Sequence, residues 1–204
     1  MTIYKNNAVL DANGGLHSSR ALDTAISILK HHDLCQPVLF HLVLTGGQVT
    51  DYQATIKALA RRLRNHGCRI EYFGGYESAE DKGGVHAHCF LLIETSKKSP
   101  FRIMSIADGD YLHKLADRKK INRIHVAKPQ NPMHEGQFFA RPVVAGGKLA
   151  NCLEWVKYAY KSRSKAGVQR RETYFNSEFN ANTAKRVAEK AAMVAPTAKA
   201  TVAA

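Results

Sequence analysis

The spacing of hydrophobic residues predicts alternating helices and strands in the first half of the chain. Apolar residues of 16–34 recur at helical intervals, and residues 37–45, PVLFHLVLT, form an apolar run typical of a strand. Residues 51–65 again have helical spacing, and Gly67 follows them as a stop signal. We therefore expect a helix, a strand and a second helix in this order.

A predicted hairpin comes next. Residues 68–78, CRIEYFGGYES, and residues 85–94, VHAHCFLLIE, read as two strands joined by a short turn at 80–83. The consecutive glycines 74–75 suggest a bulge in the first of these strands. Strand, helix and hairpin together indicate an α+β fold with an antiparallel sheet.

The pattern in the second half is weaker. We expect helices at 110–120, 148–163 and 183–194, strands at 121–128 and 137–145, and a disordered Ala-rich end. This divides the chain into an N-terminal extension with a helix (1–36), a main domain (37–166) and a basic, helical C-terminal extension (167–204).

Charge points to a polyanionic partner. The 204 residues include 30 Lys and Arg against 17 Asp and Glu, a formal net charge of +13. Residues 114–171 hold 14 of the basic residues and only three acidic ones. Such a basic stretch is typical of nucleic-acid binding, although a merely basic, soluble surface is the alternative. We expect phosphate contacts from Lys157, Arg163, Lys165, Arg123 and Lys128.

Several classes of protein are excluded by composition. With 45% hydrophobic residues the chain can bury a core. No apolar run approaches the roughly 18 residues of a membrane span, and the first residues have no secretory signal, so we expect no membrane partner. The four cysteines are scattered without CxxC spacing, which favours a reducing, cytoplasmic setting.

A pair of histidines suggests a metal site. His86 and His88 lie two apart on a predicted strand, so both imidazoles share one face, which we expect to be open to solvent. A regular hairpin sets Glu77 almost opposite His86. Two imidazoles and a carboxylate suit Mg²⁺ or Mn²⁺ acting on a phosphate. The alternative is three ordinary surface residues, and Glu71, Glu80 or His41 are the other possible third ligands.

A tyrosine and a lysine on the predicted helix 148–163 form a second candidate. Tyr158 and Lys161 are three residues apart and share a helix face, so the cation can assist a phenolate nucleophile. Tyr160 lies about 200° around the helix by the same periodicity and should pack in the core. Alternatively, Tyr158 is a packing residue and Lys161 a solvated charge.

In combination these motifs carry a family resemblance. FHLVLT (40–45), GGVHAHCFLLIE (83–94) and WVKYAYKS (155–162) follow the order of the three motifs of HUH-superfamily rolling-circle replication initiators. The chain most resembles the single-tyrosine replication proteins of small plasmids and filamentous or satellite phages, over about residues 37–165. Ala87, between the histidines, is smaller than the hydrophobic residue common in the family.

The resemblance implies a fold and an activity. The fold would be a sheet of about five antiparallel strands on an RRM-like βαββαβ core, with helices packed on one face and the catalytic tyrosine on a helix. His86, His88 and Glu77 would hold the ion, and Tyr158, assisted by Lys161, would attack single-stranded or hairpin origin DNA. The products would be a 5′-phosphotyrosyl enzyme and a free 3′-OH that primes rolling-circle replication. No Walker motif is present, so a host helicase and polymerase would be partners.

Two other functions fit the same residues. An RRM-like sheet could bind single-stranded nucleic acid without catalysis, by stacking bases on Phe40, Tyr72, Phe73 and Phe90. An HUH relaxase or transposase would keep the chemistry but serve mobilisation or transposition. Relaxases usually cluster three histidines, and only His41 could supply the third here.

Overall fold

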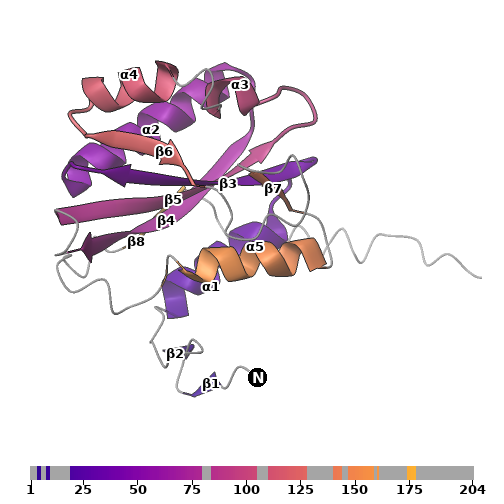
Figure 1. Cartoon of the computed structure of the whole chain (residues 1–204). Coiled ribbons are helices and arrows are strands. Elements are labelled where there is room, and N and C mark those ends of the chain that lie inside the picture. Colours follow the sequence, from indigo (N-terminus) through magenta and orange to yellow (C-terminus); the bar gives the residue numbers. More distant parts are fainter. Residues whose placement is uncertain are drawn as a thin grey trace, which may run out of the picture.

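The structure, a computed structural model, describes residues 4–5, 8–9, 19–79, 84–104, 110–127, 140–143, 147–158, 160 and 174–177. Its elements are shown in Figure 1. In chain order they are β1 (Tyr4–Lys5), β2 (Ala8–Val9), α1 (Ser19–His31), β3 (Pro37–Thr45), α2 (Val49–Asn65), β4 (Ile70–Ala79), β5 (Gly84–Glu94), α3 (Phe101–Met104), α4 (Asp110–Arg118), β6 (Arg123–Val126), β7 (Ala140–Pro142), α5 (Gly147–Tyr158) and β8 (Tyr174–Asn176).

An antiparallel sheet forms the centre of the molecule. Five strands follow one another in the order β6-β3-β5-β4-β8, and the short β7 pairs with β3 on the same edge as β6. All of these pairings are antiparallel. The predicted α+β class with an antiparallel sheet is thus confirmed, and β3 has the bounds that its apolar run predicts.

Helices cover both faces of this sheet, so the expectation that they pack on one face is wrong. α2, α3 and α4 lie on one side of the sheet, and α1 and α5 lie on the other (Figure 1). The reason is that β3 and β5 are apolar at both parities: Leu39 and Leu92 are buried on one face, Phe40 and Leu91 on the other. A strand that is apolar on both sides needs a cover on both sides.

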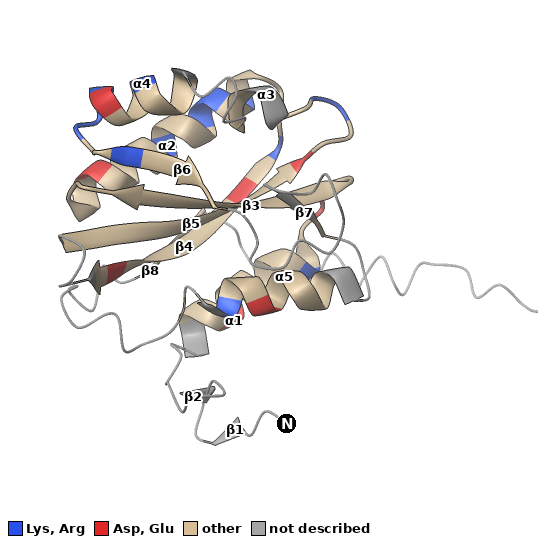
Figure 2. Ribbon diagram, viewed as in Figure 1, with Lys and Arg blue, Asp and Glu red and all other residues tan. Residues whose placement is uncertain are grey.

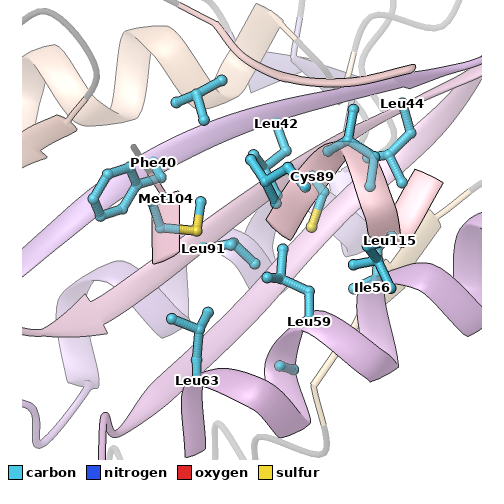
Figure 3. Close-up of a cluster of buried hydrophobic side chains, with 14 of the residues drawn as sticks. Phe40, Leu42, Leu44, Ile56, Leu59, Leu63, Cys89, Leu91, Met104 and Leu115 are labelled. Carbon is cyan, nitrogen blue, oxygen red and sulfur yellow. The ribbon is translucent and has the colours of Figure 1, made fainter. Parts of the chain in front are cut away.

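Two hydrophobic clusters result, one on each face. The cluster under α2, α3 and α4 is drawn in Figure 3, where side chains of both central strands meet those of the helices. The labelled members are Phe40, Leu42, Leu44, Ile56, Leu59, Leu63, Cys89, Leu91, Met104 and Leu115. The second cluster joins α1 and α5 to the opposite face, so α1 packs directly on the sheet although it precedes residue 37.

Tyr52 of α2 ties the ends of β3 and β5 together. Its hydroxyl accepts the N–H of Gly47 at 2.9 Å and donates to the carbonyl of Val85 at 2.6 Å. The helix begins at Val49, two residues before its predicted start, and Asp51 accepts the N–H of Gln48 at its first turn. These bonds fix the start of β5, where the predicted metal ligands lie.

The hairpin of β4 and β5 is regular, so the bulge expected at the two glycines is wrong. Pairing runs without interruption from Ile70 opposite Ile93 to Ala79 opposite Gly84. Gly74 has a different role: a Cβ there would lie 2.0 Å from the carbonyl oxygen of His88. Any side chain at this point would force the two strands apart.

The remaining predictions meet the structure in part. β6, β7, α4 and α5 occur where strands and helices are expected. Within the described residues, β6 and α4 are shorter than predicted, and α5 begins one residue earlier, at Gly147. The predicted helix 183–194 and the Ala-rich end lie outside the described residues. Among the helices described, none is long and apolar enough to cross a membrane.

Candidate metal centre

Glu77, His86 and His88 converge at the hairpin of β4 and β5. Glu77 is paired directly with His86, and Oε2 of Glu77 lies 3.3 Å from Nε2 of His86 and 3.4 Å from Nε2 of His88. One potential ligand atom from each residue lies within 4.8 Å of the others. The regular register produces this convergence, because it sets the carboxylate against the two imidazoles of one strand face.

These separations fit a shared ion. Bonds of about 2.1 Å from an ion set neighbouring ligand atoms about 3.0 Å apart in octahedral and 3.4 Å apart in tetrahedral geometry. The oxygen-to-nitrogen distances of 3.3 and 3.4 Å fall in this range. The Glu/His/His group could therefore hold a metal ion.

The group is more enclosed than the sequence predicts. His88 and Glu77 are buried, at 7% and 8% exposed, while His86 is half-buried. An open face for both histidines was expected, but His88 packs against the buried His41 of the neighbouring strand.

His41 of β3 contacts His88 on the side of the ring that faces away from Glu77. Its Nε2 lies 2.8 Å from Nδ1 of His88, the ring nitrogen opposite the one near Glu77. Its ring stacks on that of Phe90, with the ring centroids 4.4 Å apart, and forms a T-shaped pair with the ring of Trp155, with the centroids 5.4 Å apart. Burial keeps the pKa of His41 well below its usual range, and His88 and His125 add to this effect. His41 is thus a neutral neighbour of His88 on the side away from Glu77.

Glu71, another alternative ligand, does not join the group. Glu71 is paired with Leu92, six residues before Glu77 on β4, and its carboxylate accepts the hydroxyl of Ser177. Glu80 lies outside the described residues.

His125 was not considered as a site residue in the sequence. It is paired with Val43 of β3, which is also paired with His88, so both histidines flank one residue of the central strand. Burial lowers the pKa of His125, with Arg123 and His88 contributing. The alternation of Arg123 and His125 with buried apolar residues in 121–128 is the signal that could have revealed their shared face.

The helix of the predicted nucleophile lies over the same face. Trp155 of α5 forms T-shaped ring pairs with His41 and Phe90, and α5 ends three residues later at Tyr158. The side chain of Tyr158 and all of Lys161 lie outside the described residues. Tyr160 is 1% exposed and stacks on Tyr174, and burial raises its pKa, which confirms its predicted place in the core.

Of the predicted phosphate contacts, two can be located. Arg123 is exposed on β6 and alternates with the buried Ile124, so it belongs to the sheet face of the metal group. Lys157 forms an ion pair with Glu154 at 2.5 Å on α5. Lys128, Arg163 and Lys165 lie outside the described residues.

Much of the described basic charge lies on the other side of the sheet. Figure 2 shows Lys and Arg on α2 and α4, in the layer opposite α5. Within the basic stretch these are Lys114 and Arg118 of α4, with Lys119 and Lys120 directly after it. Arg123, by contrast, shares the sheet face of Glu77, His86 and His88.

The aromatic residues proposed for base stacking are largely inaccessible. Phe40, Phe73 and Phe90 are completely buried beneath the two helical layers, and Tyr72 is half-buried. A bare sheet that stacks bases is thus absent from the described part of the fold.

The groups that could take part in chemistry are therefore three: a possible metal-binding triad, a buried histidine in contact with His88, and a helix on the same sheet face that ends at a tyrosine. No model of a known protein family and no curated protein matches the chain.

Proposed function

We propose that the chain is a metal-dependent single-stranded DNA endonuclease and ligase of the HUH type, which nicks a replication origin through a 5′-phosphotyrosine intermediate. The observation that carries this proposal is the convergence of Glu77, His86 and His88 on one sheet face beneath the helix that ends at Tyr158. A metal ligand set and a tyrosine helix are the two parts that this chemistry needs.

The order of the elements supports the proposal. The succession β3, α2, β4, β5, α4, β6 has the βαββαβ pattern of the split-βαβ motif. The sheet order β6-β3-β5-β4 sets the last strand of that pattern beside the first, with the third strand between the first and second. We interpret this as the RRM-like core expected from the resemblance, with α1 and α5 added on the second face.

The proposed step is an in-line transfer of the DNA phosphodiester to tyrosine. The phenol of Tyr158 loses its proton to water, and its oxygen bonds to phosphorus. The bond from phosphorus to the 3′ oxygen breaks, and that oxygen takes up a proton from water. Lys161, three residues on, balances charge on the phenolate or phosphate. Joining is the reverse, in which a 3′-OH attacks and the phenoxide leaves. The phosphotyrosine bond conserves the energy of the broken bond, so no ATP is required.

The donor set fits a divalent ion. An ion held by Glu77, His86 and His88 would polarise the scissile phosphate and offset its developing negative charge. Two imidazoles among three protein ligands favour Mn²⁺ over Mg²⁺, because Mg²⁺ prefers oxygen ligands. Three protein ligands leave coordination positions for phosphate oxygens. Arg123, on the same face, is our candidate for a contact to the DNA backbone.

A covalent-capture assay tests the proposal. The wild-type chain is incubated with Mn²⁺ and labelled single-stranded oligonucleotides, including hairpins and a randomised pool, and separated under denaturing conditions. We expect a labelled protein band in wild type and in Tyr160→Phe, and none in Tyr158→Phe. Tyr160→Phe is the matched control, because it removes the same hydroxyl two residues away.

The outcomes separate the possible errors. An adduct that persists in Tyr158→Phe identifies the wrong tyrosine, and peptide mapping then locates the right one. Absence of any adduct with the pool, together with tight binding of single strands, would replace the nuclease with a non-catalytic binding module.

A further inference from the structure

We propose that His41 is a positioning residue for the metal centre: it accepts the Nδ1–H of His88 and so leaves the lone pair of His88 Nε2 directed at the ion. This inference rests on the proposed metal site and assigns a role to a residue outside its ligand set. It also answers whether His41 is a third histidine ligand, as a relaxase-like arrangement would require.

Only one proton can lie between the two facing ring nitrogens. Nε2 of His41 and Nδ1 of His88 are 2.8 Å apart, so one nitrogen donates and the other accepts. Both rings are buried, at 5% and 7% exposed, which strengthens the bond and raises the cost of breaking it.

The ion determines the direction of this bond. Nε2 of His88, 3.4 Å from Oε2 of Glu77, must be unprotonated to bind a metal. A neutral His88 then carries its proton on Nδ1 and donates it to His41. Metal-binding histidines usually donate their second N–H to a carboxylate or a carbonyl, and here a neutral imidazole takes that place.

His41 itself is held rigidly. Its ring lies at 10° to Phe90 and at 86° to Trp155. Its Nδ1 is buried and has no hydrogen-bond partner among the described residues. A polar nitrogen retained in an apolar setting is costly and is explained by a function of the other nitrogen of the ring. Because Nε2 faces His88 and lies beyond it as seen from Glu77, His41 is excluded from the ligand shell of the same ion.

Two substitutions separate positioning from packing. His41→Phe keeps an aromatic ring between Phe90 and Trp155 but removes the acceptor. His41→Gln keeps an acceptor oxygen on a side chain of similar reach. Calorimetric titration of the full chain with MnCl₂ should show Mn²⁺ affinity about 10–100-fold weaker in His41→Phe, the range typical of outer-shell partners, and substantially restored in His41→Gln.

A spectroscopic measurement reads the tautomer directly. In ¹⁵N-labelled wild type loaded with diamagnetic Zn²⁺, long-range ¹H–¹⁵N spectra should show His88 protonated at Nδ1 and metal-bound at Nε2. Urea unfolding without metal checks that both variants are folded.

The results are decisive in either direction. Equal Mn²⁺ affinity in wild type and His41→Phe, equal loss in both variants, or a proton on Nε2 of metal-loaded His88 would each overturn this inference and leave the proposed function standing. A wild-type chain that binds neither Mn²⁺ nor Zn²⁺ would instead overturn the metal centre of the proposed function, and the role of His41 with it.

Discussion

Gly74→Ala tests how closely the two strands of the metal hairpin approach each other. A Cβ at this position would lie 2.0 Å from the carbonyl oxygen of His88 and 2.7 Å from Cζ of Phe175. Real Cβ contacts stay above 3.0 Å, so the backbone of β4 or β5 must move by about 1 Å. The ring of Phe175 can turn away, but the carbonyl belongs to a paired strand and cannot.

Two effects on stability oppose each other. Overpacking at such a site costs about 1–3 kcal/mol. The smaller conformational freedom of alanine in the unfolded chain returns about 0.4–1 kcal/mol. The cost of the clash exceeds the gain from the unfolded chain, so we expect the free energy of unfolding to fall by about 1–2 kcal/mol. A shift of about 1 Å at His88 also exceeds the roughly 0.2 Å tolerance of metal–ligand distances, so Mn²⁺ affinity should fall as well.

Urea unfolding without metal and calorimetric titration with Mn²⁺ measure the two effects. The matched control introduces Gly74→Ala into a Phe175→Ala background, which removes the ring but leaves the carbonyl. The cost of Gly74→Ala should persist there. Stability within about 0.5 kcal/mol of wild type, the usual range of surface changes, would refute the argument from the carbonyl. Full recovery in the Phe175→Ala background would identify the ring as the obstacle.

Three further predictions address the site and its surroundings. Glu77→Gln should weaken Mn²⁺ binding by at least ~10-fold in calorimetry, while Glu71→Gln should not, because Glu71 lies outside the triad. Without metal, the free energy of unfolding should decrease as the pH is lowered from about 6.5, because His41 takes up a proton in the unfolded chain but resists it when buried. The decrease should be up to about 1.4 kcal/mol per pH unit. Urea unfolding at pH 7.5 and 5.0 should show a smaller decrease for His41→Gln, and an equal decrease would contradict this. Arg123→Glu should weaken binding to all single strands alike in anisotropy titrations, and should reduce the slope of log affinity against log salt concentration by about 1. Lys57→Glu, in the opposite layer, should have a smaller effect. Equal effects would argue against a contact at Arg123.

Strands and their register were predictable because their signals are local. The apolar run 37–45 gave the bounds of β3, and simple alternation across a short turn was enough to pair Glu77 with His86. The sequence analysis also named His41 as a possible third ligand, and the structure sets it beside His88. These inferences need only the period of a strand and the geometry of a hairpin.

Other features depend on distances that a sequence does not contain. The glycines at 74–75 suggested a bulge, but what demands a glycine at Gly74 is the carbonyl of a residue on another strand. The second helical layer was missed because the resemblance led us to expect one covered face, although the continuous apolar run of β3 already favoured two. The hydrogen bond between His41 and His88 depends on how two rings on neighbouring strands are oriented. The alternation of residues along a strand predicts which face a ring lies on but not its orientation.

The burial of β3 and β5 on both faces has a consequence for how the ligands become ordered. Strands in the centre of a doubly covered sheet open only when the whole domain unfolds, so their amides are expected to exchange hydrogen most slowly. His88 is on such a strand, and its ring is packed before any ion arrives. The entropy of ordering this ligand is therefore lost during folding and not on metal binding. A centre built in this way is preorganised, and its affinity reflects coordination chemistry more than the flexibility of the chain.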